Sequence, residues 1–286
     1  MEIDNGGVRV HVEAEGPEGA PTVLLIHGLM GALEYWGELP EEITDGRRVL
    51  RMDLRGHGRS DRTPGAYQVP GYASDAIAVL EQLTAGPAVV VGHSLGAVTA
   101  WHVAQQRPDL VAGAVLEDPP LYAGEQAEFP GSVADVVFPV LRQGVIDGQA
   151  AGLDHAGWVA RVGASPSGSS REWTIADELT PEGLDARATA LSLVDPDAIL
   201  AACSTETLAP TDTASPVRPP VLLLRADAGM HPAFGPQHAE RLARSHPDVE
   251  VVEIEGAGHP ISASRAARER FLTLLAEFLD RRLPAA

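Results

Sequence analysis

The stretch Gly92-His93-Ser94-Leu95-Gly96 decides the fold and the chemistry expected of this chain. It directly follows the apolar run 88–91 and opens a small-residue segment with helical character, 95–106. A serine at such a strand–turn–helix junction is held in strained backbone geometry, with its hydroxyl raised above the carboxyl end of a sheet. A β-carbon at either glycine would collide with the neighbouring helix or strand. The pattern therefore predicts that Ser94 is a nucleophile.

Strand-like and helix-like segments alternate on both sides of this stretch, which indicates a mostly parallel sheet covered by helices. The runs 23–26, 89–91 and 221–224 are continuously apolar, as expected of strands buried on both faces. Strands are expected at 8–14, 22–26, 49–52, 88–91, 112–116, 221–224 and 249–254. Helices are expected at 72–83, 95–106, 236–244 and 266–282.

Between residues 119 and 216 the alternation stops, and a mainly helical pattern is broken by Gly, Ser and Pro. We expect a core domain formed by 1–118 and 217–286, with 119–216 inserted as a helical cap. The cap has 14 acidic residues and 4 arginines, which disfavours a strongly anionic substrate unless an arginine such as Arg142 or Arg161 faces the cavity. Its bulky residues, expected to line a pocket or to pack the cap, are Tyr122, Phe129, Phe138, Trp158 and Trp173.

The composition excludes several classes of function. The 286 residues carry a net charge of −19, which argues against binding nucleic acid or an anionic membrane. No apolar run approaches the roughly 20 residues that span a bilayer, and the N-terminus lacks the features of a secretory signal. The chain is therefore expected to be cytoplasmic. Cys203 is the only cysteine, so neither an intrachain disulfide nor a cysteine-based metal site is expected.

A serine hydroxyl needs a neighbouring base, and the position of each of the ten histidines in the chain selects His259. His259 follows the last expected strand and precedes the final helix, at the sheet edge where Ser94 also emerges. His27 and His57 are interpreted as structural loop residues, and His93 is expected to point away from the serine. The histidines expected at the surface, without metal-ligand spacing, are His231, His238 and His246.

Acyl transfer also needs two backbone N–H groups aimed at the developing negative charge, an oxyanion hole. Leu95, directly after the nucleophile, is expected to supply one of them. Leu29, in the loop His27-Gly28-Leu29-Met30 after the strand 22–26, is expected to supply the other.

Taken together, these motifs resemble the α/β-hydrolase fold over nearly the whole chain. The early His27-Gly28, the segment 52–61, the elbow at Ser94 and the Gly-x-Gly-His at 256–259 come in the family's order and at similar spacing. The resemblance implies a central, mostly parallel sheet flanked by helices, a helical cap and a catalytic triad.

The triad acid departs from the usual pattern of that family. The acid usually follows the strand after the cap, but Gly229 occupies its position in Arg225-Ala-Asp-Ala-Gly229. A second arrangement, which resembles zearalenone-type lactone hydrolases, places the acid after the strand that follows the nucleophile helix. Asp118 aligns there, and we favour it over Asp227, while a non-catalytic Asp-Pro at 118–119 stays an alternative. Glu117 is expected to point to the opposite face.

The sequence thus predicts a serine hydrolase acting on a carboxylic ester or lactone through Ser94, His259 and Asp118. Its partner is expected to be a small, moderately hydrophobic substrate, with no organic cofactor and no metal; a homo-oligomer is left open. Alternatives are a C–C bond hydrolase or a peptidase on the same fold, or a ligand sensor that turns over slowly. Haloalkane dehalogenation is disfavoured, because that chemistry uses a carboxylate nucleophile where this chain has Ser94.

Overall fold

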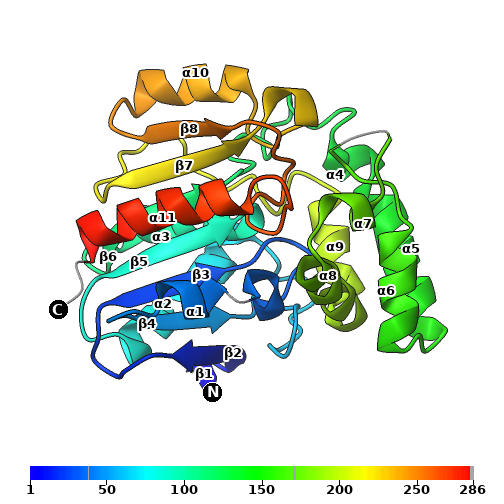
Figure 1. Cartoon of the computed structure of the whole chain (residues 1–286), viewed down its shortest axis with the longest axis horizontal. Helices are drawn as coiled ribbons and strands as arrows, with labels where there is room; N and C mark the ends of the chain where they lie inside the picture. Colours follow the sequence, from blue (N-terminus) through cyan, green and yellow to red (C-terminus); the bar gives the residue numbers. More distant parts are fainter. Residues whose placement is uncertain (38, 170–171, 284–286) are drawn as a thin grey trace.

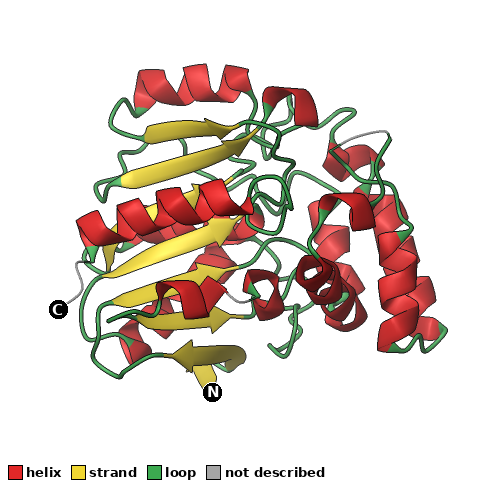
Figure 2. Cartoon of the chain, viewed as in Figure 1, coloured by secondary structure: helices red, strands yellow, loops and turns green. Residues whose placement is uncertain are grey.

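A computed structural model describes residues 1–37, 39–169 and 172–283 and shows an eight-stranded sheet with helices on both faces (Figures 1 and 2). The strand order is β1-β2-β4-β3-β5-β6-β7-β8. Pairing is antiparallel for β1–β2 and β2–β4 and parallel for every other pair, which confirms the mostly parallel sheet. The strands are β1 (Glu2–Asn5), β2 (Val8–Glu15), β3 (Thr22–Ile26), β4 (Arg48–Met52), β5 (Ala88–His93), β6 (Val111–Glu117), β7 (Val221–Ala226) and β8 (Glu250–Ile254).

The edge strand β1 was not expected from the sequence. It forms a hairpin with β2 through Gly6 and Gly7, which adopt φ values of 62° and 93°. Glycine reaches these angles without steric cost, and Gly-Gly is a favoured pair for the two central residues of such a hairpin loop. The strand itself is short and polar, and only Ile3 carries a buried side chain, so hydrophobic patterning alone gave no sign of it.

The sheet separates two hydrophobic cores, because successive side chains of a strand point to opposite faces. Leu24 of β3 contacts the side covered by α2 (Val69–Leu83), α3 (Leu95–Gln106) and α10 (Pro236–Ser245). The next residue, Leu25, contacts the side covered by α1 (Leu39–Ile43) and α11 (Arg268–Arg282). The expected core-facing stripe of α11 is buried: Phe271, Leu274, Leu275, Phe278 and Leu279.

The helices between β6 and β7 lie beside the carboxyl ends of the parallel strands (Figure 1). They fall in the segment for which a cap is predicted. They are α4 (Val133–Val136), α5 (Phe138–Ala150), α6 (His155–Gly163), α7 (Ile175–Glu178), α8 (Pro181–Leu193) and α9 (Pro196–Ala202). Two short 3-10 helices, η1 (Leu33–Trp36) and η2 (Ala228–Met230), follow β3 and β7.

The bulky residues of this segment have different surroundings. Trp158 is buried within a cluster of residues from 153–191, and Tyr122 is buried in the main core, so both serve packing. Phe138 packs against the cluster around Met30, in the loop after β3. Trp173 is 39% exposed.

The expectation that His246 lies at the surface was wrong. Its side chain is buried, the imidazole lies 5.0 Å from the Trp101 ring, and Nε2 is 3.0 Å from the carbonyl oxygen of Ser215. His246 is buried because of tertiary packing. It follows α10, and Leu242 near the end of that helix shares a hydrophobic core with Trp101 of α3. Spacing in the sequence could exclude a metal site but could not reveal this packing.

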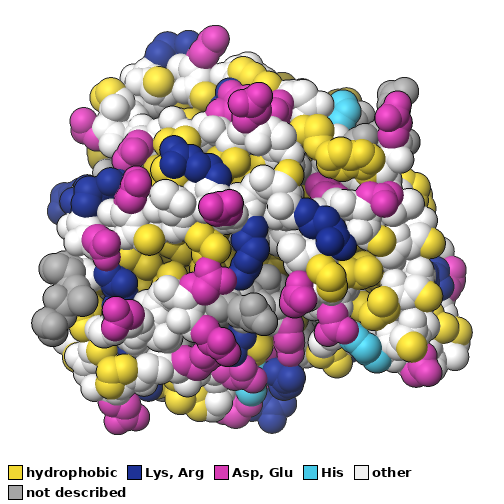
Figure 3. Space-filling model, viewed as in Figure 1, with side chains coloured by type: hydrophobic (Ala, Val, Ile, Leu, Met, Phe, Trp, Pro, Cys, Tyr) yellow, Lys and Arg dark blue, Asp and Glu magenta, His cyan; other side chains and the backbone are white. Residues whose placement is uncertain are grey.

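Acidic and basic side chains are mixed over the face shown in Figure 3, with carboxylates in excess as the net charge of −19 requires. Among the described residues, no helix has the length and apolar character needed to cross a bilayer.

Candidate active site

Ser94 stands between the end of β5 and the start of α3, with φ 52° and ψ −114°. A positive φ is uncommon for a residue other than glycine and marks local strain at functional turns. The turn is braced by the Ser94 N–H, which donates to the carbonyl of Glu117 at 2.9 Å. A β-carbon on Gly92 would lie 2.2 Å from the Gly96 carbonyl oxygen, and one on Gly96 would lie 2.2 Å from the Ile26 carbonyl oxygen. The expectation that a β-carbon at Gly92 or Gly96 would collide with the neighbouring helix or strand is therefore confirmed.

His259 lies in the loop between β8 and α11, and its Nδ1 is 2.6 Å from Oδ2 of Asp118. The imidazole is 34% exposed, and Asp118 is fully buried. Burial opposes protonation of His259, but the hydrogen bond and charge of Asp118, together with the charge of Glu117, outweigh it and raise the pKa of His259 above its ordinary value. Two of the three predicted triad residues are thus in direct contact.

Asp118 follows β6 directly, where its backbone turns to φ 42°. Its carboxylate accepts N–H groups from the backbone of Ala233 at 2.8 Å and of Phe234 at 3.1 Å, besides the His259 contact. Ala226 N–H lies at the longer distance of 3.4 Å. These donors fix the orientation of the carboxylate. Such an acid can orient an imidazole.

Asp227, the alternative acid, is held elsewhere. Its oxygens accept the N–H groups of Gly229 and Gly256, each at 2.7 Å, and these two bonds lower the pKa of the carboxyl. No hydrogen bond or ion pair links it to His259 among the residues that the structure describes. Asp227 therefore serves the turn after β7, and Asp118 is the carboxylate at the imidazole.

The N–H of Leu29, one of the two expected oxyanion donors, belongs to a peptide group that is held in place. The Gly28 carbonyl of that group accepts the Gly31 N–H at 3.0 Å and lies 2.8 Å from Nδ1 of His27. The peptide group is planar, so fixing this carbonyl directs the N–H of Leu29 to the opposite side. Across the described ranges, neither the Leu29 N–H nor the Leu95 N–H has a hydrogen-bond acceptor.

His27 has a structural role in this loop, as expected. Its Nε2 accepts the N–H of Leu54 at 3.0 Å, so the proton of the neutral ring sits on Nδ1 and is donated to Gly28. Burial, with the nearby His57, lowers the pKa of His27 to about 3 and keeps the ring neutral. A neutral His27 is the form that can make both bonds.

Glu117 points away from His259 toward the other side of the strand end, as expected. It accepts the Tyr35 hydroxyl at 2.9 Å and the Ser262 N–H at 2.7 Å. Burial raises the pKa of Glu117 to about 7, although these donors favour its ionised form. Tyr35 also stacks on the His93 ring at 4.5 Å, and His93 lies 4.7 Å from the His259 ring. Glu117, Tyr35, Ser262 and His93 therefore form a largely buried network of side chains next to the His259 imidazole.

Sequence reasoning missed the roles of Tyr35, Ser262 and one cation, Arg187. The arginines that it considered for the cavity lie elsewhere: Arg142 binds Pro196 and Asp197, and Arg161 is exposed. The guanidinium near the site is instead that of Arg187 on α8, which donates to the carbonyl of Met30 at 3.3 Å. The available signal was a single charge between Ala186 and Ala188 in a helical stretch.

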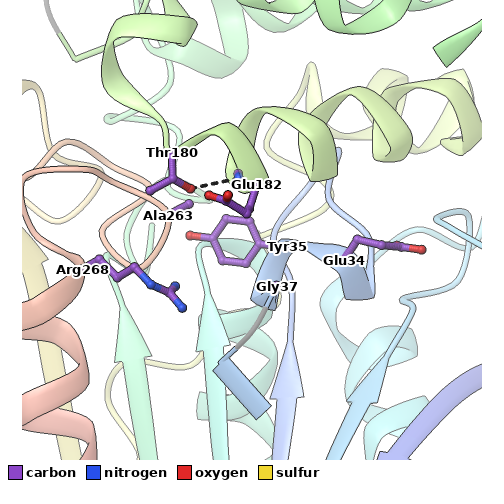
Figure 4. Close-up of a pocket in the computed structure, with 8 residues that line it drawn as sticks. Glu34, Tyr35, Gly37, Thr180, Glu182, Ala263 and Arg268 are labelled. Carbon is purple, nitrogen blue, oxygen red and sulfur yellow. Dashed lines mark hydrogen bonds between the residues drawn. The ribbon is translucent and has the colours of Figure 1, made fainter. Parts of the chain in front are cut away.

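Tyr35 also borders a small pocket between η1, the start of α8 and the segment leading to α11 (Figure 4). Thr180 caps α8 there, accepting the N–H of Gly183 at 3.0 Å. The pocket has a volume of about 40 Å³, whereas ligand sites usually enclose at least about 300 Å³. It is too small for an ester substrate and does not include Ser94.

A strained serine at a strand–helix turn and an imidazole paired with a buried carboxylate define a hydrolase-type site on a parallel α/β sheet. The sequence model of the alpha/beta hydrolase fold matches residues 21–266. The chain belongs to this family.

Curated relatives match part of the chain. Epoxide hydrolase B of Mycobacterium tuberculosis is 36% identical over 131 residues, which cover 44% of this chain and 37% of that protein. The 2-(acetamidomethylene)succinate hydrolase of Mesorhizobium japonicum is 33% identical over 116 residues, covering 41% of each protein. The chain thus spans about two-fifths of the length of these relatives.

Solved structures match over nearly the whole chain. E-2-(acetamidomethylene)succinate hydrolase superposes with a TM-score of 0.72 at 21% identity and 98% coverage of both chains. A structure described as Est816, an N-acyl homoserine lactone degrading enzyme, has a TM-score of 0.71 at 22% identity, covering 97% of this chain and all of the other. At these identities the likeness shows the fold.

Proposed function

We propose that this hydrolase cleaves a carboxylic ester or lactone through a Ser94–His259–Asp118 triad and an acyl-enzyme intermediate. The observation that carries the proposal is the 2.6 Å contact between His259 Nδ1 and Asp118 Oδ2, at the sheet edge where Ser94 occupies its strained turn. Esterases, a lipase and lactone-degrading enzymes among the relatives support acyl chemistry.

The steps follow from the roles of these groups. His259 accepts the Ser94 proton at Nε2 while the serine oxygen attacks the carbonyl carbon, and Asp118 fixes the tautomer and stabilises the imidazolium. The N–H groups of Leu29 and Leu95 hold the negative oxygen of the tetrahedral intermediate. The leaving alkoxide takes the proton from His259, and water activated by the same imidazole then releases the acyl group. None of these steps requires a cofactor.

Epoxide hydrolysis, the activity named for several relatives, does not suit a serine nucleophile. Attack of Ser94 on an epoxide carbon would form an alkyl ether. Water cannot release that ether by adding to a carbonyl, because the ether has none. A serine at this position therefore favours substrates that already contain the carbonyl.

The segment 119–216 is assigned as a cap over the core formed by 1–118 and 217–286. Met30 of the proposed oxyanion loop shares a buried cluster with Val145, Val194 and Ile199 of this segment. Contact of a cap side chain with the loop that holds the substrate carbonyl gives the cap a direct influence on substrate choice. A small, partly apolar substrate fits these surroundings.

The proposal is tested by measuring hydrolysis of p-nitrophenyl esters of graded chain length and of several lactones, with wild-type protein and Ser94→Ala. We expect turnover of at least one ester or lactone and a loss of about 10⁶-fold in kcat in the variant, as removal of a triad nucleophile produces. A folded wild-type protein that turns over no ester or lactone would contradict it and favour a ligand sensor.

A further inference from the structure

A cation from the cap, Arg187, lies beside the proposed catalytic groups. It extends from α8, the helix that passes over Tyr35 in Figure 4 and packs against η1. Its Nη1 donates to the carbonyl oxygen of Met30 at 3.3 Å, one residue after the proposed oxyanion donor Leu29. Burial lowers the pKa of His93, whose ring is 4.7 Å from that of His259, and the positive charge of Arg187 adds to this effect. The guanidinium thus lies close to the reaction centre.

Among the described residues, no carboxylate lies within ion-pair distance of this cation. In the part of the chain that the structure describes, Arg187 is the one arginine that is not exposed and has no Asp or Glu oxygen within 4.0 Å. The charge of Glu178 favours the protonated form of Arg187, but its carboxylate lies farther than 4.0 Å from the guanidinium. That carboxylate accepts the hydroxyls of Ser167 and Ser169. Arg55, by comparison, makes two bonds of 2.7 Å to Asp75.

An unpaired, partly buried charge is costly to the folded protein. Burial lowers the pKa of the Arg187 guanidinium, but arginine stays protonated at neutral pH. A neutral carbonyl at 3.3 Å uses one of its five N–H donors. Guanidinium groups pair with carboxylates through two parallel N–H bonds, which are about twice as strong as bonds between neutral groups.

We infer that Arg187 is the binding residue for a carboxylate on the substrate, so that the preferred ester or lactone is acidic. The inference rests on the proposed Ser94 chemistry, and it narrows the substrate class of that site. It matches the exception allowed for the acidic cap, an arginine near the substrate, but that arginine is Arg187 and neither Arg142 nor Arg161.

The test compares two esters of equal length, monoethyl succinate and ethyl butyrate, in which a carboxylate replaces a terminal methyl group. Released ethanol gives kcat/KM for wild type, Arg187→Met and the control Arg161→Met, an exposed arginine of the neighbouring helix α6. We expect the loss of kcat/KM in Arg187→Met to be about 10- to 150-fold larger on monoethyl succinate than on ethyl butyrate, the size of a charged hydrogen bond. Arg161→Met should retain both activities.

Calorimetry on Ser94→Ala separates this inference from the proposed function. Monoethyl succinate should bind Ser94→Ala and bind Ser94→Ala/Arg187→Met at least about 10-fold more weakly. Arg187-dependent binding by a wild-type protein that turns over no ester or lactone would leave the carboxylate site in place and contradict the hydrolase proposal. Equal affinity in the two variants, no binding to Ser94→Ala, or equal losses on both esters would overturn the role of Arg187.

Discussion

At the scale of single residues, two adjacent carboxylates, Asp118 and Glu117, act on the same imidazole through different contacts. Asp118 binds His259 directly, whereas Glu117 binds Tyr35 and Ser262 on the other side of the strand end. The division follows from the alternation of side chains along a strand. Both carboxylates favour the protonated form of His259.

The pH profile should report this arrangement. Only neutral His259 can accept the Ser94 proton, and its pKa is raised above 6.5, so kcat/KM should rise with pH through a midpoint above 6.5. Glu117→Gln removes one of the charges that favour protonation, and the midpoint should move to lower pH. Rates measured between pH 5 and 9 check both shifts. The same midpoint in both proteins would argue against an electrostatic role for Glu117.

At the scale of secondary-structure elements, the elbow depends on close contact between β3, β5 and α3. Gly96 lies at the start of α3, where a β-carbon would approach the carbonyl oxygens of Ile26 and His27 to 2.2 and 2.5 Å. Both atoms belong to the backbone of β3 and the loop after it, so neither can rotate away. The absence of a side chain at this position sets the spacing between helix and sheet.

Gly96→Ala should therefore destabilise the protein by at least about 2 kcal/mol, at the upper end of overpacking effects, despite the higher helix propensity of alanine. Denaturant unfolding of the variant measures the loss. Gly86→Ala is the matched control, because its β-carbon would meet no atom within 4 Å. Similar stability of the two variants would show that the contact is not tight.

Elements with a local signal were predictable from the sequence. The continuous apolar strands and the stripe of α11 needed no tertiary information, and the glycines around Ser94 marked the turn. Arg187 was not predictable, because a lone charge in a helix is usually solvated. Its position beside Met30 arises only when two segments 157 residues apart come together. Tyr35 and Ser262, joined at Glu117, were missed for the same reason.

At the scale of the whole molecule, a buried ion pair connects regions far apart in the chain. Arg55, in the loop after β4, makes two bonds of 2.7 Å to Asp75 of α2. Asn5, at the end of β1, donates to the same carboxylate at 2.7 Å. The pair thereby joins the antiparallel edge of the sheet to a helix on its face.

Asp75→Asn should destabilise the protein by about 3–5 kcal/mol, because it leaves the charge of Arg55 buried without its partner. Equilibrium unfolding in urea gives the difference. Glu13→Gln serves as the control. It removes a carboxylate from an exposed ion pair with Arg59 and a partly buried one with Arg51, which keeps Glu15 as a partner, and should cost no more than about 1 kcal/mol. Equal losses of unfolding free energy in the two variants would contradict the larger effect expected at the buried ion pair.

The central claim, a Ser94–His259–Asp118 triad, is tested most directly by the rate at which a fluorophosphonate labels Ser94, followed by mass spectrometry. This reaction needs the activated serine and no knowledge of the substrate. Wild type and Asp227→Asn should be labelled at Ser94 at similar rates. Asp118→Asn should be labelled several orders of magnitude more slowly, as loss of the correct imidazole tautomer produces. Absence of labelling in folded wild type, or slow labelling of Asp227→Asn with fast labelling of Asp118→Asn, would contradict the account.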